Sequence, residues 1–233
     1  MFFPIGDDQI KGGFKPIFSY AFIALNVIVF WYQYSLGPRA GNQLVLDFGA
    51  IPDKIAHGER FSTLFTSMFM HGSWMHLIGN MVFLWVFGDN IEAVVGNLKF
   101  ALFYIIGGLA AALTHISIDP ASTIPTVGAS GAIAAVLGGY IIMFPSSRIK
   151  LLFLLFARVF RWPAIAFLGI WIAQQLFNGI GSLGVKSQGG VAWWAHIGGF
   201  AFGFIIGLMW RRRYDTPGNY VSGAFPTLGG RRA

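Results

Sequence analysis

The charged residues of this chain divide it into six long stretches that contain no Asp, Glu, Lys or Arg. These stretches cover residues 16–38, 61–88, 101–118, 120–147, 162–185 and 187–210. About 20 apolar residues cross the hydrocarbon core of a bilayer, and a charge at its centre costs about 2.5–3.5 kcal/mol. The pattern therefore predicts six membrane-spanning helices with the charged segments between them.

Turn-forming residues narrow each stretch to a predicted helix. A Leu36-Gly37-Pro38 turn ends the first helix, Pro145 ends the fourth and Pro163 opens the fifth, in the usual places for Pro and Gly. The predicted helices cover residues 17–34, 74–87, 100–116, 128–145, 163–177 and 192–210. The predicted fold class is all-α, a polytopic membrane protein with a six-helix bundle over residues 17–210, an N-terminal segment of residues 1–16 and a basic tail of residues 211–233.

The connection between the first two predicted spans, residues 37–70, is unusually long. It mixes apolar positions such as Leu44, Leu46 and Ile51 with charged ones. This mixture indicates a structured piece that lies in the outer membrane interface. An ordinary loop outside the membrane is the alternative.

Composition supports the membrane class. The chain has 233 residues, of which 55% are hydrophobic and 11% charged, whereas soluble proteins carry about 25% charged residues. This composition argues against a soluble globular domain and against a disordered chain. There is no Cys, which excludes a disulfide framework, a thiolate nucleophile and a Cys-based metal site.

Lys and Arg are distributed unevenly between the two ends of the predicted helices. With a cytoplasmic N-terminus, 12 of the 16 Lys and Arg residues fall on the cytoplasmic side. This bias follows the positive-inside rule and places both termini in the cytoplasm. The Arg211-Arg212-Arg213 cluster directly follows the last span, so we interpret it as a stop-transfer anchor near anionic lipid rather than a nucleic-acid site. We expect a bacterial inner membrane, with an archaeal or organellar membrane as the alternative.

Polar residues inside spans are candidates for function, because burying them in the membrane is costly. The first group surrounds the start of the second helix, where His76 and Asn80 share one helical face. His71 lies five residues before His76, which is poor spacing for two metal ligands, and no Asp, Glu or Cys is near. We therefore expect no metal, and we interpret His71 as a structural residue whose ring bonds the loop backbone.

The second group is Gly128-Ala129-Ser130-Gly131, at the start of the fourth helix. Its glycines allow close backbone approach and leave the Ser130 amide, at a helix N-terminus, able to face an anion. The G-x-S-x-G elbow of soluble hydrolases does not fit, because residue 132 is Ala. Without such neighbours, a membrane Ser is more often a packing residue.

The third group is His196 with Gly199 and Gly203, on one face of the sixth helix. Small residues on two helices let their backbones come close, which would bring the Ser130 hydroxyl within reach of the His196 ring. Alone, His196 would more often be a satisfied core histidine. The matching small face predicted on the fourth helix consists of Ser130, Ala134 and Gly138.

Topology relates the three groups. In the predicted orientation, the second, fourth and sixth helices all begin at the outer side, so His76, Asn80, Ser130 and His196 lie at a similar depth. A nucleophile, a base and amide-type donors are the parts of an acyl-transfer site.

These residues resemble the rhomboid family of intramembrane serine proteases. The motifs occur in the family's order on the second, fourth and sixth helices of a six-helix chain. They are H-x4-H-x3-N at His71, His76 and Asn80, G-x-S-G at Gly128, Ser130 and Gly131, and H-x2-G-x3-G at His196, Gly199 and Gly203. The resemblance covers about residues 17–210, which are then expected to form a rhomboid protease domain.

The resemblance implies a role for each residue. Ser130 is the expected nucleophile and His196 its general base, in a dyad without an Asp. His76, Asn80 and the Ser130 amide are expected to bind the oxyanion. Structural roles near the site are expected for His71, Gly128, Gly131, Gly199 and Gly203. No cofactor and no metal are implied.

One position departs from the family's pattern. Some well-known bacterial members carry Tyr four residues after the nucleophile, where its ring stacks on the catalytic His. This chain has Ala134 there. Either another aromatic residue supports His196, or the ring is less constrained.

The implied activity is cleavage of single-span transmembrane proteins, in contact with membrane lipid and near the outer face. The substrate helix has to unwind to present a carbonyl, so Gly or small residues near the cut are expected. One alternative is a non-catalytic rhomboid-like protein that binds membrane clients, although such relatives usually lack the Ser or the His. The other is a small transporter, which would need charged groups at the midplane and often has repeated halves.

Overall fold

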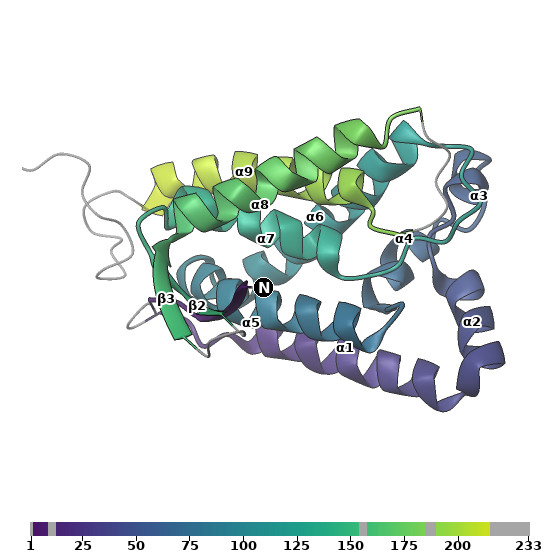
Figure 1. Cartoon of the computed structure of the whole chain (residues 1–233), viewed down its shortest axis with the longest axis horizontal. Coiled ribbons are helices and arrows are strands. Elements are labelled where there is room, and N and C mark those ends of the chain that lie inside the picture. The colour runs from purple at the N-terminus through teal and green to yellow at the C-terminus, as the bar shows by residue number, and fades with distance from the viewer. Residues whose placement is uncertain (1, 9–12, 154–157, 185–189, 215–233) are drawn as a thin grey trace, which may run out of the picture.

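The computed structural model describes residues 2–8, 13–153, 158–184 and 190–214. Its long helices lie side by side along a common direction (Figure 1). They are α1 (Ile17–Ser35), α5 (Trp74–Val95), α6 (Asn97–Ile118), α7 (Ser130–Met143), α8 (Ala164–Gly181) and α9 (Trp193–Tyr214). Of the predicted tail, residues 215–233 lie outside the described residues.

Five of the described helices, α1, α5, α6, α8 and α9, are long and apolar enough to cross a membrane. The prediction of an all-α, polytopic membrane protein is therefore confirmed. α7 is apolar but has only 14 residues, so the fourth helix predicted over residues 128–145 is too long at both ends. Gly128 has a φ of 127°, which is not helical, and Phe144, before Pro145, has already left the helical region.

α7 lies at the centre of the bundle and contacts α5, α6, α8 and α9. Its residues from Gly131 to Tyr140 are all buried. At 1.5 Å per residue, α7 is roughly 21 Å long, which is less than the ~30 Å hydrocarbon core. Ala111 of α6 lies level with Gly131, and α6 continues to Ile118, roughly 10 Å further. The start of α7 is therefore sunk below the end of α6.

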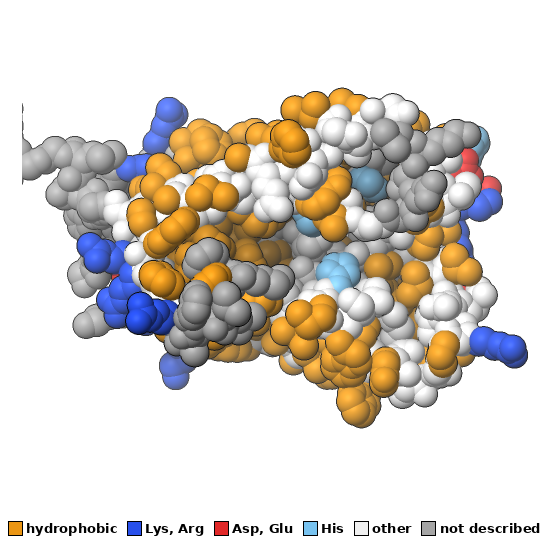
Figure 2. Space-filling model, viewed as in Figure 1, with side chains coloured by type: hydrophobic (Ala, Val, Ile, Leu, Met, Phe, Trp, Pro, Cys, Tyr) orange, Lys and Arg blue, Asp and Glu red, His pale blue; other side chains and the backbone are white. Residues whose placement is uncertain are grey.

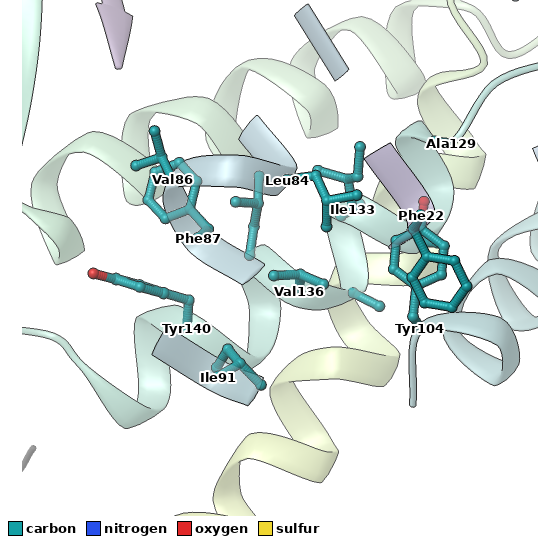
Figure 3. Close-up of a cluster of buried hydrophobic side chains, with 14 of the residues drawn as sticks. Phe22, Leu84, Val86, Phe87, Ile91, Tyr104, Ala129, Ile133, Val136 and Tyr140 are labelled. Atoms are coloured by element: carbon teal, nitrogen blue, oxygen red, sulfur yellow. The ribbon is translucent and has the colours of Figure 1, made fainter. Parts of the chain in front are cut away.

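The centre of the core joins α5 to α7 (Figure 3). Phe87, Val136 and Tyr140 are fully buried there, and the rings of Phe87 and Tyr140 meet edge to face with centroids 5.0 Å apart. Phe22 of α1 stacks on Tyr104 of α6 at 4.4 Å. Aromatic contacts of this kind add about 0.5–1.5 kcal/mol to the gain from burial, and they hold α7 in a fixed position.

α7 and α9 touch through their backbones. A methyl group on Gly203 would overlap the carbonyl oxygen of Ala135, and one on Gly199 would overlap that of Gly131. The predicted close approach of the two helices is confirmed. The predicted face on α7 was Ser130, Ala134 and Gly138, and Gly138 does meet the backbone of α9. The other two backbone contacts fall one residue later, at Gly131 and Ala135. The side chain of Ser130 instead meets the side chain of His196 on α9.

We expect Gly203→Ala to lower the free energy of unfolding by about 1–3 kcal/mol, because overpacking forces the helices apart. The thermal unfolding temperature of the purified protein in detergent measures this loss. Gly169→Ala in α8 is the matched control, since no atom lies within 4 Å of the added Cβ. Equal unfolding temperatures for the two variants would contradict the backbone contact.

α5 extends to Val95, eight residues past its predicted end at residue 87. The prediction ended the helix where charged residues begin, but those residues are paired. The Glu92 carboxylate accepts hydrogen bonds from the backbone N–H groups of Phe18 and Ser19 and from the Ser19 hydroxyl, each at 2.8 Å. Glu92 thereby satisfies first-turn donors of α1 and ties α1 to α5.

A three-stranded antiparallel sheet, absent from the prediction, covers one end of the bundle, here called the sheet end. It consists of β1 (Phe2–Gly6), β2 (Arg148–Phe153) and β3 (Arg158–Pro163), in the order β1-β2-β3. Asp7, just after β1, is buried and accepts hydrogen bonds from Asn90 of α5 and from the Tyr140 hydroxyl of α7. Lys and Arg side chains gather at this end (Figure 2).

The opposite end, here called the loop end, is where α5, α7 and α9 begin (Figure 1). Residues 37–70 are structured there, as predicted, into α2 (Gly37–Phe48), α3 (Pro52–Ala56), α4 (Thr63–Thr66) and the short 3₁₀ helix η1 (Ser67–Phe69). The Arg60 guanidinium donates to the Leu46 carbonyl oxygen at 3.0 Å, which ties the segment before α4 back to α2.

Candidate active site

Ser130 and His196 meet at the loop end. Ser130 is the first residue of α7, and His196 lies in the first turn of α9. The Ser130 Oγ is 2.8 Å from Nε2 of His196. The structure therefore brings together the two side chains that the sequence singled out, although they are 66 residues apart.

Gln175 of α8 holds the other side of the His196 ring. Its Oε1 lies 2.8 Å from Nδ1 of His196, and Gln175 is buried. Because an amide oxygen only accepts hydrogen bonds, Nδ1 carries the proton in this arrangement and Nε2 presents its lone pair to Ser130. The Ser130 hydroxyl then donates to Nε2.

Two tryptophans flank the His196 ring. The centroid of the Trp171 ring of α8 lies 5.8 Å from that of the His196 ring, with a 34° tilt between the two rings. The Trp193 ring meets the His196 ring edge-on, with the two centroids 6.4 Å apart. Ala134, where some family members have Tyr, is buried in the core. Trp171 and Gln175 therefore supply the support for His196 that Ala134 does not.

Asn80 and His71 form a buried pair. Ser73 caps the N-terminus of α5 by accepting from the His76 N–H, and Asn80 lies one turn beyond His76. The Asn80 side-chain Nδ2 is 2.9 Å from Nε2 of His71. Burial, together with nearby His76, lowers the pKa of His71 to about 3. A neutral His71 therefore accepts from Asn80, and the second hydrogen of Nδ2 is left for another acceptor. The His71 ring thus bonds the Asn80 side chain, and a backbone hydrogen bond at Phe69 in the loop also acts on it, the kind of contact that the sequence predicted.

Gly128 places the chain before Ser130 against His76 and Asn80. A Cβ at Gly128 would lie 2.8 Å from Nε2 of His76 and 3.6 Å from Nδ2 of Asn80. Its φ of 127° is also one that side chains other than glycine's rarely permit. Gly128 donates to the Ser67 carbonyl oxygen at 2.9 Å, which fixes the turn into α7.

These residues line one cavity of about 560 Å³ at the loop end. His76, Asn80, Gly128, Ser130, Gly131 and His196 all contribute to its wall. His71 is fully buried behind it, and Gly199 and Gly203 serve the α7–α9 contact. Histidine side chains are visible in the hollow on the face shown in Figure 2. Within the described ranges, no three His, Cys, Asp or Glu side chains are grouped closely enough to hold a metal ion.

Comparison with known proteins identifies the family. A family model described as the Rhomboid domain matches residues 58–213, well over half of the chain. The chain belongs to the rhomboid family. The rhomboid match contains α5 to α8 and α9 as far as Arg213, and so it contains every residue of the cavity wall named above.

Three similar rhomboids come from different kinds of organism. Rhomboid protease GluP of Bacillus subtilis is 33% identical over 58% of this chain and 26% of its own length. Rhomboid protein 1, mitochondrial, of Saccharomyces cerevisiae is 28% identical over 81% of this chain and 51% of its own length. Presenilin-associated rhomboid-like protein A, mitochondrial, of Danio rerio is 29% identical over 82% of this chain and 48% of its own length.

The chain thus spans from about a quarter to about half of the length of these relatives. Membership of the rhomboid family, with a relative named as a protease, supports the class of intramembrane serine protease. It also supports an integral membrane protein of several spans. Because two of the relatives are mitochondrial, a bacterial inner membrane stays a prediction.

The sequence reasoning missed Gln175 as a partner of this rhomboid's His196. One signal was present, because Gln174-Gln175 is a polar pair inside an uncharged stretch of 24 residues, 162–185. Helix periodicity alone could not show which of the two glutamines faces α9. Trp171 lies one turn before Gln175 on α8. It is one of several aromatic residues of the chain, and the sequence did not show which of them would contact His196.

Proposed function

We propose that this rhomboid is an intramembrane serine endopeptidase that cleaves the helices of single-span membrane proteins by a Ser130–His196 dyad. The observation that carries the proposal is the 2.8 Å contact between Ser130 Oγ and His196 Nε2, inside a cavity of a membrane protein. We propose residues 17–210 as the catalytic domain. The loop end faces outward and both termini are cytoplasmic, because the Lys and Arg residues gather at the sheet end (Figure 2).

The chemistry follows from the hydrogen bonds. His196 Nε2 takes the proton of the Ser130 hydroxyl as Oγ attacks the scissile carbonyl carbon. The tetrahedral intermediate collapses, the peptide C–N bond breaks, and the leaving amine takes the proton from the imidazolium. Water, activated by the same nitrogen, then hydrolyses the acyl-enzyme and restores the Ser130 hydroxyl.

Donors for the oxyanion come from two elements. The backbone N–H of Ser130 lies in the first turn of α7 and therefore has no hydrogen-bond partner within its own helix. The Asn80 amide has a second hydrogen beyond the one given to His71, and the His76 ring lines the same wall. Such donors act on the charge that develops on the carbonyl oxygen in the transition state.

The cavity also provides water, which hydrolysis requires and the hydrocarbon core lacks. Because α7 is short and sunk, the cavity extends inward from the loop end to Ser130. A substrate helix has to unwind to place a carbonyl there, so we propose substrates with Gly or small residues near the outer end of their span.

Gln175 acts as a positioning residue in this proposal. We expect Gln175→Leu to lower kcat by about 10–100-fold with little change in KM, because the His196 ring loses the acceptor that sets its tautomer. Steady-state kinetics on a single-span substrate measure both constants. Gln175→Glu, which keeps an acceptor oxygen, should recover most of the loss. A fall in activity that Gln175→Glu does not recover would indicate a packing role only.

Incubation of the purified full chain, in lipid nanodiscs, with a fluorescent single-span substrate tests the proposed function. Mass spectrometry of the products should show one cut near the outer end of the span. A client-binding rhomboid would retain the substrate uncut, and a transporter would neither bind nor cut it. Either of these outcomes would contradict the proposal.

A further inference from the structure

One wall of the cavity has no part in this chemistry. It is formed by the last turns of α6, and it contributes His115 and, at the end of the helix, Asp119. The two residues are four apart and therefore share one face of the helix. Both are polar groups at a site where most of the surrounding wall is apolar or glycine.

Neither side chain uses its full hydrogen-bonding capacity. The Nδ1 atom of His115 is buried and has no hydrogen-bond partner. Asp119 bonds His115 and Ser122 through its backbone only; within the described ranges its carboxylate has no hydrogen bond and no salt bridge. Asp119 is also the one acid among the described residues of the cavity wall, and none of those described residues is Lys or Arg. Among the described residues of the wall, the negative charge of Asp119 therefore has no cationic partner.

The position of this pair relative to Ser130 follows from helix geometry. A Cβ on Gly131, the neighbour of Ser130, would lie 2.6 Å from the Ala111 Cβ, so Ala111 marks the level of the nucleophile. At 1.5 Å per residue, His115 lies roughly 6 Å and Asp119 roughly 12 Å further toward the loop end. An extended substrate advances about 3.3 Å per residue. The pair therefore lies opposite the substrate residues about two to four positions outward from the scissile bond.

We propose that His115 and Asp119 form a specificity site for a Lys or Arg side chain, two to four residues to the outer side of the cut. This inference rests on the proposed function. The carboxylate of Asp119 accepts a charge-assisted hydrogen bond from the cation, and the His115 ring lines the wall beside it on the same helix face. Ile116 and Ile124, in the same wall, pack against the aliphatic stem.

The test uses one single-span substrate that carries Ala, Lys or Glu at the second, third or fourth residue outward from the cut. At one of these positions, wild type should cleave the Lys substrate about tenfold faster in kcat/KM than the Glu substrate, with Ala between them. Asp119→Asn should remove this order while cleaving the Ala substrate within about twofold of wild type. His115→Leu should weaken the Lys preference in the same direction.

Glu59→Gln is the matched control. It also removes one negative charge at the loop end, but Glu59 is exposed beside Lys54 and does not line the cavity. The Lys preference should persist in this variant. Asp119→Lys should reverse the order and favour the Glu substrate.

Two results would overturn the specificity site while leaving the protease intact. One is equal cleavage of the Lys and Glu substrates by wild type at all three positions. The other is a Lys preference that survives Asp119→Asn. If wild type cleaves none of the substrates, the proposed function itself fails, and the specificity site fails with it.

Discussion

Ser130→Ala should lower the cleavage rate of a single-span substrate by about 10⁴–10⁶-fold, the range found when a serine nucleophile is removed. The hydroxyl at 2.8 Å from His196 Nε2 is the group that forms the acyl-enzyme in this account. His196→Ala should cost nearly as much, and the double variant little more, because nucleophile and base act as a unit. Product formation followed over hours by gel and mass spectrometry has the range to measure these losses.

Ser117→Ala is the control for the nucleophile. Ser117 is exposed on α6 and donates to the Thr114 carbonyl oxygen, so its loss should leave the rate unchanged. Cleavage at the same bond by Ser130→Ala, at more than about a thousandth of the wild-type rate, would exclude Ser130 as the nucleophile.

Asn80→Ala should lower kcat by about 10²–10³-fold, the usual effect of removing one oxyanion donor. Its amide is fixed by His71 at 2.9 Å and lines the cavity beside Gly128. KM should change little, because the interaction strengthens only as charge develops in the transition state.

Asn80→Ala also leaves the buried Nε2 of His71 without a donor, which costs about 1–3 kcal/mol of stability. Asn26→Ala separates the two effects. Asn26 is fully buried on α1 and donates to the Phe22 carbonyl oxygen. The Asn26→Ala variant should therefore have a lower unfolding temperature than wild type, while its kcat stays near the wild-type value. If Asn26→Ala and Asn80→Ala lose the same activity, Asn80 has a structural role only.

The site was predictable because its parts are visible in local patterns. Ser130 and His196 stand beside small residues at the starts of two apolar helices, and small residues allow helices to touch. The alternation of spans then places both residues at the same membrane side. The rotation of α7 about its axis could not be predicted in this way. The contacts with α9 fall at Gly131 and Ala135 instead of Ser130 and Ala134, and a shift of one residue corresponds to about 100° around the helix.

Other features depend on contacts that are distant in sequence. β1 pairs with residues 150–153 of β2, and Asp7 accepts from Tyr140, 133 residues away. No local pattern marks such a pairing. The end of α5 was predicted too early for the same reason, because the partners of Glu92 lie on α1, more than 70 residues earlier.

The central claim is that the Ser130 hydroxyl is activated by His196. A fluorophosphonate reacts with activated serines, and peptide mass spectrometry locates the adduct. The account predicts one adduct on the peptide that contains Ser130, formed by the wild-type protein and absent in His196→Ala. An adduct on another serine, or labelling of Ser130 that is equally fast without His196, would contradict it.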